Sequence, residues 1–365
     1  MKGNRIVLRG TLLAAPSLVA LSLVALSLAA LSLVALSLAA RPLAAETLEI
    51  VTTLPAYQAI AREIAGERAH VQAISRGDED AHFVKPKPSF ALMLRRADVF
   101  ITTGLDLELW APVLIDKAGN RSIRVGQTGY VSASEGVPLL DIPEVADRSG
   151  GDVHLYGNPH IFTSPLNAKL VAANIARALS AVDPGGAAWY QQRLEAFNSR
   201  VDESLFGEEL VELLGAETLD SLARNGRLVS FLEGQEYEGG PLIERLGGWL
   251  GKGLAFRDRK IVAYHKNWIY FTDLFGLDVI DYVEPKPGIP PSARHVHRLI
   301  GRIEDEKVKV IFAASYFSVR QIESIADRTG CVAVVVPLGP GGEGPVDYFG
   351  LIDLWVDGLA AAFSE

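Results

Sequence analysis

Histidine is the residue type in this chain whose positions point to chemistry. The sequence has seven histidines but one cysteine, Cys331. A transition-metal site must therefore be built from imidazole or carboxylate, and no internal disulfide can form. Three histidines stand at the ends of predicted strands or in loops between predicted elements, namely His82, His160 and His265. Because neutral imidazole binds Zn²⁺ well, three such side chains provide most of a tetrahedral shell.

The other four histidines are expected to have different roles. His154 stands close to His160, across a Gly-Asn-Pro turn in the stretch DVHLYGNPHIF. We expect His154 to be a loop residue that makes a hydrogen bond, and leave open a role as an accessory ligand. His70 lies in a predicted strand and should be half-exposed, while His295 and His297 should lie on a solvated helix face or loop.

Short β-rich runs alternate with amphipathic helices from residue 47 onward, and these elements must position the histidines. In the first half of the chain, strands are predicted at 47–54, 69–75, 98–104 and 122–126, and helices at 55–66 and 89–97. In the second half, strands at 259–265, 277–284, 308–315 and 331–338 alternate with helices at 267–276, 292–306, 318–330 and 347–363. This alternation predicts an α/β fold with mostly parallel sheets and helices on their faces.

Two long helices are predicted between these βα series. The first covers 164–182, with Ser164 as its N-cap and Pro165 as its first residue, and the second covers 185–214. We predict an N-terminal α/β lobe over 46–184, a connecting helix region over 185–224, and a C-terminal α/β lobe over 225–365 that includes an insertion around 207–257. Ligands at strand ends of both lobes would then meet in a cleft.

Residues 1–45 have the layout of a secretory signal peptide and are excluded from the fold. Basic residues precede an uncharged run from Gly10 to Ala40, and a small-residue cleavage site stands before Glu46. The apolar run repeats a unit related to SLVAL and is long enough to span a bilayer. An uncleaved membrane anchor is therefore the competing interpretation, and either one predicts an extracytoplasmic protein.

The exported part of the chain is acidic. It carries all 44 Asp and Glu residues but only 31 of the 35 Lys and Arg residues. This charge argues against nucleic acid as a partner and is compatible with cations.

Five stretches of the sequence occur in a recognisable order. They are DAHFVKPKPS with His82, TGLDLELW at 103–110, GNPHIF with His160, VAYHKNWIYFTDLFGLDVI with His265, and VEPKPGIPPSARH at 283–295. Together they resemble the metal-binding proteins of bacterial ABC uptake systems for zinc and manganese, the cluster A-I or family 9 solute-binding proteins. The resemblance covers nearly all of residues 48–363.

The resemblance implies two lobes joined by a long rigid helix, with a divalent metal in the cleft between them. Carried over to this sequence, the metal ligands are His82, His160 and His265. Histidine in the third position implies Zn²⁺, with Mn²⁺ as the weaker expectation. The resemblance further implies a periplasmic or otherwise extracytoplasmic protein, expected to be a monomer, that moves through a small hinge and docks on the membrane permease of an ABC transporter.

The sequence departs from the family pattern where a fourth ligand is often found. Val336 occupies the place of an aspartate, and Ala314 occupies the place of a glutamate. The fourth position is left open among water and four carboxylates, Glu233, Asp80, Glu343 and Asp347. The 207–257 segment is longer than usual, and would be a surface elaboration, a cap on the cleft or a transporter contact.

Two other functions fit three histidines. One is a zinc-dependent hydrolase, which would need a general base such as Glu233 beside the metal. The other is a metal-binding surface adhesin of the same fold. Without a convincing base near the histidines, we expect a binding protein and not an enzyme.

Overall fold

The structure is a computed structural model that describes residues 47–143, 154–286, 288–342 and 344–364. The predicted signal peptide over 1–45 lies outside these described residues. None of the described helices combines the length and the apolar character needed to cross a membrane.

The first lobe is built on a four-stranded parallel sheet with the strand order β2-β1-β3-β4. Side chains alternate between its faces, so Ile50 packs in a different apolar cluster from its neighbour Val51. The cluster of Ile50 includes residues of α2 and α5, and that of Val51 includes residues of α3 and α4. The elements are β1 (Leu48–Thr52), α2 (Pro55–Ala65), β2 (Ala69–Ala73), α3 (Pro88–Arg96), β3 (Val99–Thr102), α4 (Ala111–Ala118), β4 (Tyr130–Ser132) and α5 (Pro165–Val182).

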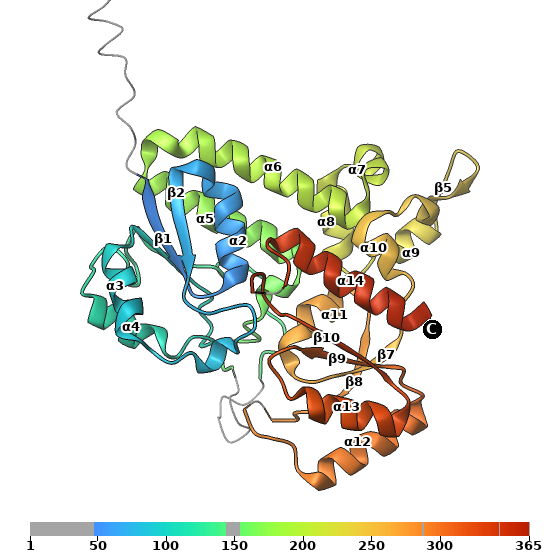
Figure 1. Ribbon diagram of the computed structural model, residues 1–365. Helices are drawn as coiled ribbons and strands as arrows, with labels where there is room; N and C mark the ends of the chain where they lie inside the picture. The colour runs from blue at the N-terminus through green and yellow to red at the C-terminus, as the bar shows by residue number, and fades with distance from the viewer. Residues whose placement is uncertain (1–46, 144–153, 287, 343, 365) are drawn as a thin grey trace, which may run out of the picture. The chain divides into compact units, whose positions relative to one another are not determined.

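The second lobe repeats this plan with a parallel sheet of order β10-β9-β7-β8. Phe312 belongs to the cluster that contains residues of α10, α11 and α14, while Ile311 belongs to the cluster with α12 and α13. Figure 1 shows the two sheets as separate groups of arrows. The elements are α10 (Gly248–Gly253), β7 (Lys260–Ala263), α11 (Ile269–Phe275), β8 (Asp278–Tyr282), α12 (Ala293–Glu306), β9 (Val310–Ala314), α13 (Val319–Thr329), β10 (Val332–Val336) and α14 (Tyr348–Ser364).

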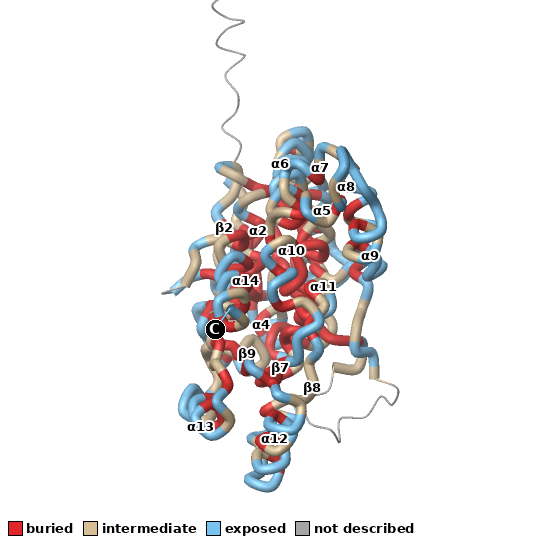
Figure 2. Tube along the Cα trace, turned by 90° about the vertical axis from the view of Figure 1, so that its right-hand side faces the viewer, coloured by how far each residue is buried: buried red, intermediate tan, exposed pale blue. Residues whose placement is uncertain are grey.

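Helix α6 (Ala187–Phe206) connects the two lobes and contacts α2 and α5 of the first and α10 of the second. One apolar core runs from Ile50 of β1 through Val201 of α6 to Phe312 of β9. Figure 2 shows buried residues along α10, α11 and α14, while α12 and α13 carry both buried and exposed residues. The α/β class and the two lobes with parallel sheets are thus confirmed, while the lobe boundaries stay predictions.

The segment after α6 adds three short helices and a small hairpin. These are α7 (Glu208–Leu214), α8 (Ala216–Arg224), α9 (Leu228–Glu233), and the antiparallel pair β5 (Glu236–Tyr237) and β6 (Gly240–Pro241). Helix α8 is fixed to α5 and α6 because Lys169 pairs with Asp202 and Asp220, both at 2.6 Å.

The fourth strand of the first sheet lies at Tyr130–Ser132, so the prediction of a strand at 122–126 was wrong. Residues 121–129 form turns instead. The side chain of Asn120 accepts from the backbone N–H of Ser122 and donates to the carbonyl of Ala97. Such local side-chain bonds compete with a strand ladder, and Val125 is left 75% exposed.

The prediction that His295 is solvated was also wrong. His295 is buried in the first turn of α12, with Nε2 2.9 Å from the carbonyl oxygen of Tyr282. Leu299 and Ile303 follow at intervals of four residues, so the three share one buried helix face. His297 is exposed and His70 lies exposed in β2, as predicted.

Candidate metal centre

His82 lies in a short 3₁₀ turn (Ala81–Phe83) beyond the end of β2. Asp80, two residues earlier, holds it with one carboxylate oxygen. Asp80 Oδ1 accepts from the backbone N–H of His82 at 3.0 Å and lies 2.7 Å from Nδ1 of the ring. A carboxylate next to Nδ1 keeps the proton on that nitrogen, so Nε2 is left with a lone pair for a metal ion.

His160 is held in the same way by the residue two positions before it. Asn158 Oδ1 accepts from the backbone N–H of His160 at 3.0 Å and lies 3.0 Å from its ring Nδ1. His160 is 2% exposed and stands directly before a 3₁₀ turn (Ile161–Thr163) that leads into α5. Both first-lobe histidines therefore present Nε2 from a local Asx-type turn.

His265 comes from the second lobe, two residues beyond the end of β7 and directly before a 3₁₀ turn (Lys266–Trp268). Its Nδ1 lies 3.3 Å from Glu284 Oε1, but the two atoms are not aligned as a hydrogen bond. Glu284 Oε1 instead accepts from the N–H of Gly288. His265 is 5% exposed, so its Nδ1 faces the Glu284 carboxylate within the protein without a hydrogen bond between them.

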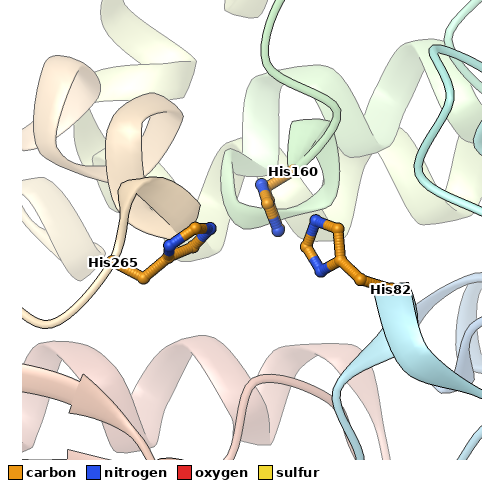
Figure 3. Close-up of side chains that lie close together, drawn as sticks. All are labelled: His82, His160 and His265. Carbon is orange, nitrogen blue, oxygen red and sulfur yellow. The ribbon is translucent and has the colours of Figure 1, made fainter. Parts of the chain in front are cut away.

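The three predicted histidines converge, as Figure 3 shows. Each offers one ring nitrogen, and these nitrogens all lie within 4.8 Å of one another. A cavity of about 20 Å³ adjoins the rings of His82 and His160 and is also lined by Asp80, Tyr316 and Gly339. Such a volume accommodates about one water molecule. Imidazoles that follow strands of both sheets thus come together, although His265 does not line this cavity.

The electrostatics of the site favour a neutral imidazole at His160. Burial lowers the pKa of His160 well below its ordinary value, and the neighbouring rings of His82, His265 and His154 lower it further. At Asp80, burial raises the pKa, but the hydrogen bonds from His82 outweigh it and the pKa ends below its ordinary value. His160 therefore keeps a lone pair at neutral pH, and Asp80 keeps its charge behind His82.

Asn158 also joins the two lobes next to the site. Its Nδ2 donates to the carbonyl of Lys266 at 2.8 Å, while its own carbonyl accepts from the hydroxyl of Tyr270 at 2.6 Å. Lys266 in turn pairs with Asp141 at 3.0 Å. One amide side chain thus touches His160 and the residue that follows His265.

The carboxylates considered as a fourth ligand lie in different places. Asp80 is beside the site, but its Oδ1 is engaged with His82. Glu233 is exposed at the end of α9, and Asp347 pairs with Arg200 at 3.7 Å and accepts from Gly350. Glu343 lies outside the described residues. Val336 and Ala314, at the positions where the resemblance implies carboxylates, are buried and apolar.

Sequence reasoning missed part of this site. His154 makes a hydrogen-bond contact as expected, but its partner is His82, with the two Nε2 atoms 3.0 Å apart. The positioning roles of Asp80 and Asn158 were not foreseen. A signal was present, because both stand two residues before a histidine, the spacing of an Asx turn.

Comparison with known protein families decides which family this is. The model of a family described as "Zinc-uptake complex component A periplasmic" (ZnuA) matches residues 50–205 and 243–362. The chain belongs to the ZnuA family. It is therefore a substrate-binding protein of the metal ABC transporter type and not an enzyme. The exposed position of Glu233 on α9 agrees, since a hydrolase would need that base at the metal.

Individual relatives of the ZnuA family resemble the chain at moderate identity. The iron-binding protein YfeA of Yersinia pestis is 26% identical over 325 residues, covering 87% of this chain and 86% of that protein. The manganese ABC transporter substrate-binding lipoprotein PsaA of Streptococcus pneumoniae is 27% identical over 158 residues, covering 43% of this chain and 49% of that protein. A zinc-bound crystal structure of a ZnuA deletion mutant superposes with a TM-score of 0.63 at 20% identity, over 87% of this chain and 98% of that one.

Proposed function

We propose that the protein captures Zn²⁺ between its two lobes and delivers it to the membrane permease of an ABC transporter. The observation that supports this most is the convergence of His82, His160 and His265, with ring nitrogens within 4.8 Å of one another. Two lobes supply these nitrogens, so binding and lobe closure become one event.

The choice of zinc follows from the chemistry of the donors. YfeA is named for iron and PsaA for manganese, and a ZnuA structure contains zinc, so the relatives differ in metal. In this chain His265 adds a third imidazole, while Val336 and Ala314 leave apolar side chains where carboxylates would suit Mn²⁺. Imidazole favours Zn²⁺ over Mn²⁺, and the same preference predicts that Cu²⁺ competes in vitro.

The first lobe would bind the ion first. His82 and His160 already present Nε2 through local hydrogen bonds to Asp80 and Asn158. His265 would complete the shell when the second lobe meets the ion. Release would begin when His265 moves away in a small hinge motion, and the first-lobe nitrogens would then give up the ion at the permease.

The location and the partner are part of the proposal. The family description includes the word periplasmic, and PsaA is named as a lipoprotein of an ABC transporter. Together with the signal-like leader, these names support an extracytoplasmic protein that docks on a permease. A monomeric state, the absence of nucleic-acid partners and a role as an adhesin stay predictions.

Titration of the metal-free protein with Zn²⁺ and with Mn²⁺ tests the proposal. We expect one tight zinc site, weaker manganese binding, and a loss of zinc affinity in His160→Ala well beyond the roughly 10–100-fold typical when an outer partner of a metal ligand is removed. His297→Ala is a matched control, because His297 is exposed on α12. Equal affinity in wild type, His160→Ala and His297→Ala would remove His160 from the metal site and contradict the three-histidine site as proposed.

A further inference from the structure

A fourth imidazole stands at the three-histidine site. His154 lies with its Nε2 3.0 Å from Nε2 of His82, and the two ring centroids are 5.1 Å apart. Its ring centroid is also 6.1 Å from that of His160. These separations resemble those among the three proposed ligands, whose ring centroids lie 5.3 Å to 6.0 Å apart.

The hydrogen bonds of His82 determine what His154 faces. His82 Nδ1 lies 2.7 Å from Asp80 Oδ1, so the proton of the neutral ring stays on Nδ1. The Nε2 atom that faces His154 therefore carries a lone pair. The 3.0 Å contact between the two Nε2 atoms places one proton between them in the metal-free protein. Around an ion, His154 would carry its proton on Nδ1, and both Nε2 atoms would offer their lone pairs to that ion.

The distance fits this exchange. Two nitrogens bound to one Zn²⁺ at about 2.0–2.1 Å, with a tetrahedral angle between them, lie about 3.3 Å apart. The observed 3.0 Å between the Nε2 atoms of His82 and His154 is a few tenths of an ångström shorter. His154 is not among the three residues whose ligand atoms all lie within 4.8 Å of one another, so its ring would have to turn toward the ion.

A turn fixes His154 relative to His160. The carbonyl of His154 accepts from the N–H of Gly157 at 3.4 Å, and Gly157 has a φ of 113° that side chains rarely adopt. Asn158 follows directly, and its N–H donates to the carbonyl of Leu140. His154 and His160 are thus the two ends of one anchored loop. The sequence also repeats the Asx-x-His spacing at His154, with Asp152 two residues before it.

We propose that His154 is the fourth protein ligand, so that the cargo ion is held by four imidazoles, three from the first lobe and one from the second. This inference rests on the proposed function and extends it to metal selectivity. An all-imidazole shell replaces the carboxylate that Val336 and Ala314 do not provide. It strengthens the preference for Zn²⁺ over Mn²⁺, because imidazole suits Zn²⁺ while carboxylate oxygen suits Mn²⁺.

The test compares His154→Ala with wild type in the full chain, with ZnCl₂ and MnCl₂ as probes. We expect His154→Ala to lose about tenfold or more in zinc affinity, and less in manganese affinity. His70→Ala is the control, because His70 is an exposed histidine in β2. X-ray absorption of the zinc-loaded proteins then counts the ligands, with four imidazoles expected in wild type and three in His154→Ala.

The outcomes separate this inference from the proposed function. Three imidazoles in wild type, or zinc affinity in His154→Ala within about twofold of wild type, would overturn the role of His154 even if His160→Ala still abolishes tight binding. If neither His154→Ala nor His160→Ala loses zinc affinity, both this inference and the proposed function are overturned. His154→Gln repeats the measurement with a side chain that keeps a polar group in the loop. If His154→Ala loses zinc affinity and His154→Gln does not, the loss comes from a packing defect in the loop.

Discussion

The two lobes hold their histidines by different means. In the first lobe, Asp80 and Asn158 each stand two residues before a histidine and bind both its backbone N–H and its ring. In the second lobe, Ala263 occupies the corresponding position before His265, and the nearest carboxylate, Glu284, comes from beyond the next strand and makes no hydrogen bond to the ring. The first lobe is thus preorganised by its own loops, while the second depends on contacts distant in sequence.

This difference suggests that the two lobes have different roles in metal binding. Preorganised rings lose little entropy on binding, so under the proposed function the first lobe would capture an ion by itself. The second lobe is tied to the first by the contact between Asn158 and the carbonyl of Lys266, and the metal would complete its orientation. Capture and closure would therefore respond differently to substitutions in the two lobes.

The largest expected effect compares His160→Ala with His265→Ala. We expect His160→Ala to lose more than about 100-fold in zinc affinity, because it removes a ligand from the capture site. His265→Ala should lose less, because the first-lobe nitrogens remain in place. Competition with a zinc chelator measures both, and a greater loss in His265→Ala would reverse the assignment of capture to the first lobe.

The next effect concerns the side chains behind the rings. We expect Asp80→Ala to weaken zinc binding by about 10–100-fold, since the ring of His82 loses its hydrogen bond and its fixed tautomer. Glu284→Ala should weaken binding less, because Glu284 makes no hydrogen bond to His265. The two affinities come from the same titration, and equal losses would show that both lobes are held alike.

A smaller effect is expected from Asn158→Asp. The aspartate keeps an oxygen for the backbone and ring of His160 but cannot donate to the carbonyl of Lys266. We expect about a tenfold loss in zinc affinity, with faster hydrogen exchange around Lys266 and little change at His160. Asn174→Asp is the control, because Asn174 Nδ2 donates to carbonyls within the first lobe. Unchanged exchange at Lys266 would argue against the interlobe role of Asn158.

The smallest effect is the pH dependence of the metal-free protein. Folded His160 has a pKa below its ordinary value, whereas the unfolded chain takes up a proton near about pH 6.5. Above that pH both states are neutral and His160 costs no stability. As the pH falls through about 6.5 toward the lower folded pKa, the unfolded state binds more protons and the free energy of unfolding decreases.

His160→Gln removes this dependence. Denaturant unfolding of the metal-free proteins at about pH 7.5 and pH 5.5 should therefore show a larger loss of stability for wild type than for His160→Gln. Equal losses would mean that His160 is not buried in the neutral form.

Much of the fold was predictable because its elements carry local signals. Helix α5 begins at Pro165, as the Ser-Pro pair predicted, and the strands of the second lobe lie within the predicted runs. The misplaced strand at 122–126 was wrong because Asn120 engages the backbone in a turn that composition does not reveal. The prediction for His295 was wrong because His295 shares the buried face of α12 with Leu299 despite its polarity.

The residue types of the site were predictable from the sequence, but the distances between its side chains were less so. His82, His160 and His265 were found because each stands beyond a strand or before a helix, and because their motifs resemble a family. The proximity of His154 to His82 depends on a turn at Gly157 and on the fold of two separate loops. No spacing along the chain measures that distance.

A crystal structure of the zinc-loaded protein, with the ion located by anomalous scattering, tests the central claim most directly. The account predicts one ion at about 2.0–2.1 Å from ring nitrogens of His82 and His160 in the first lobe and of His265 in the second. An ion held by residues of one lobe alone, with His265 turned away from it, would contradict the account.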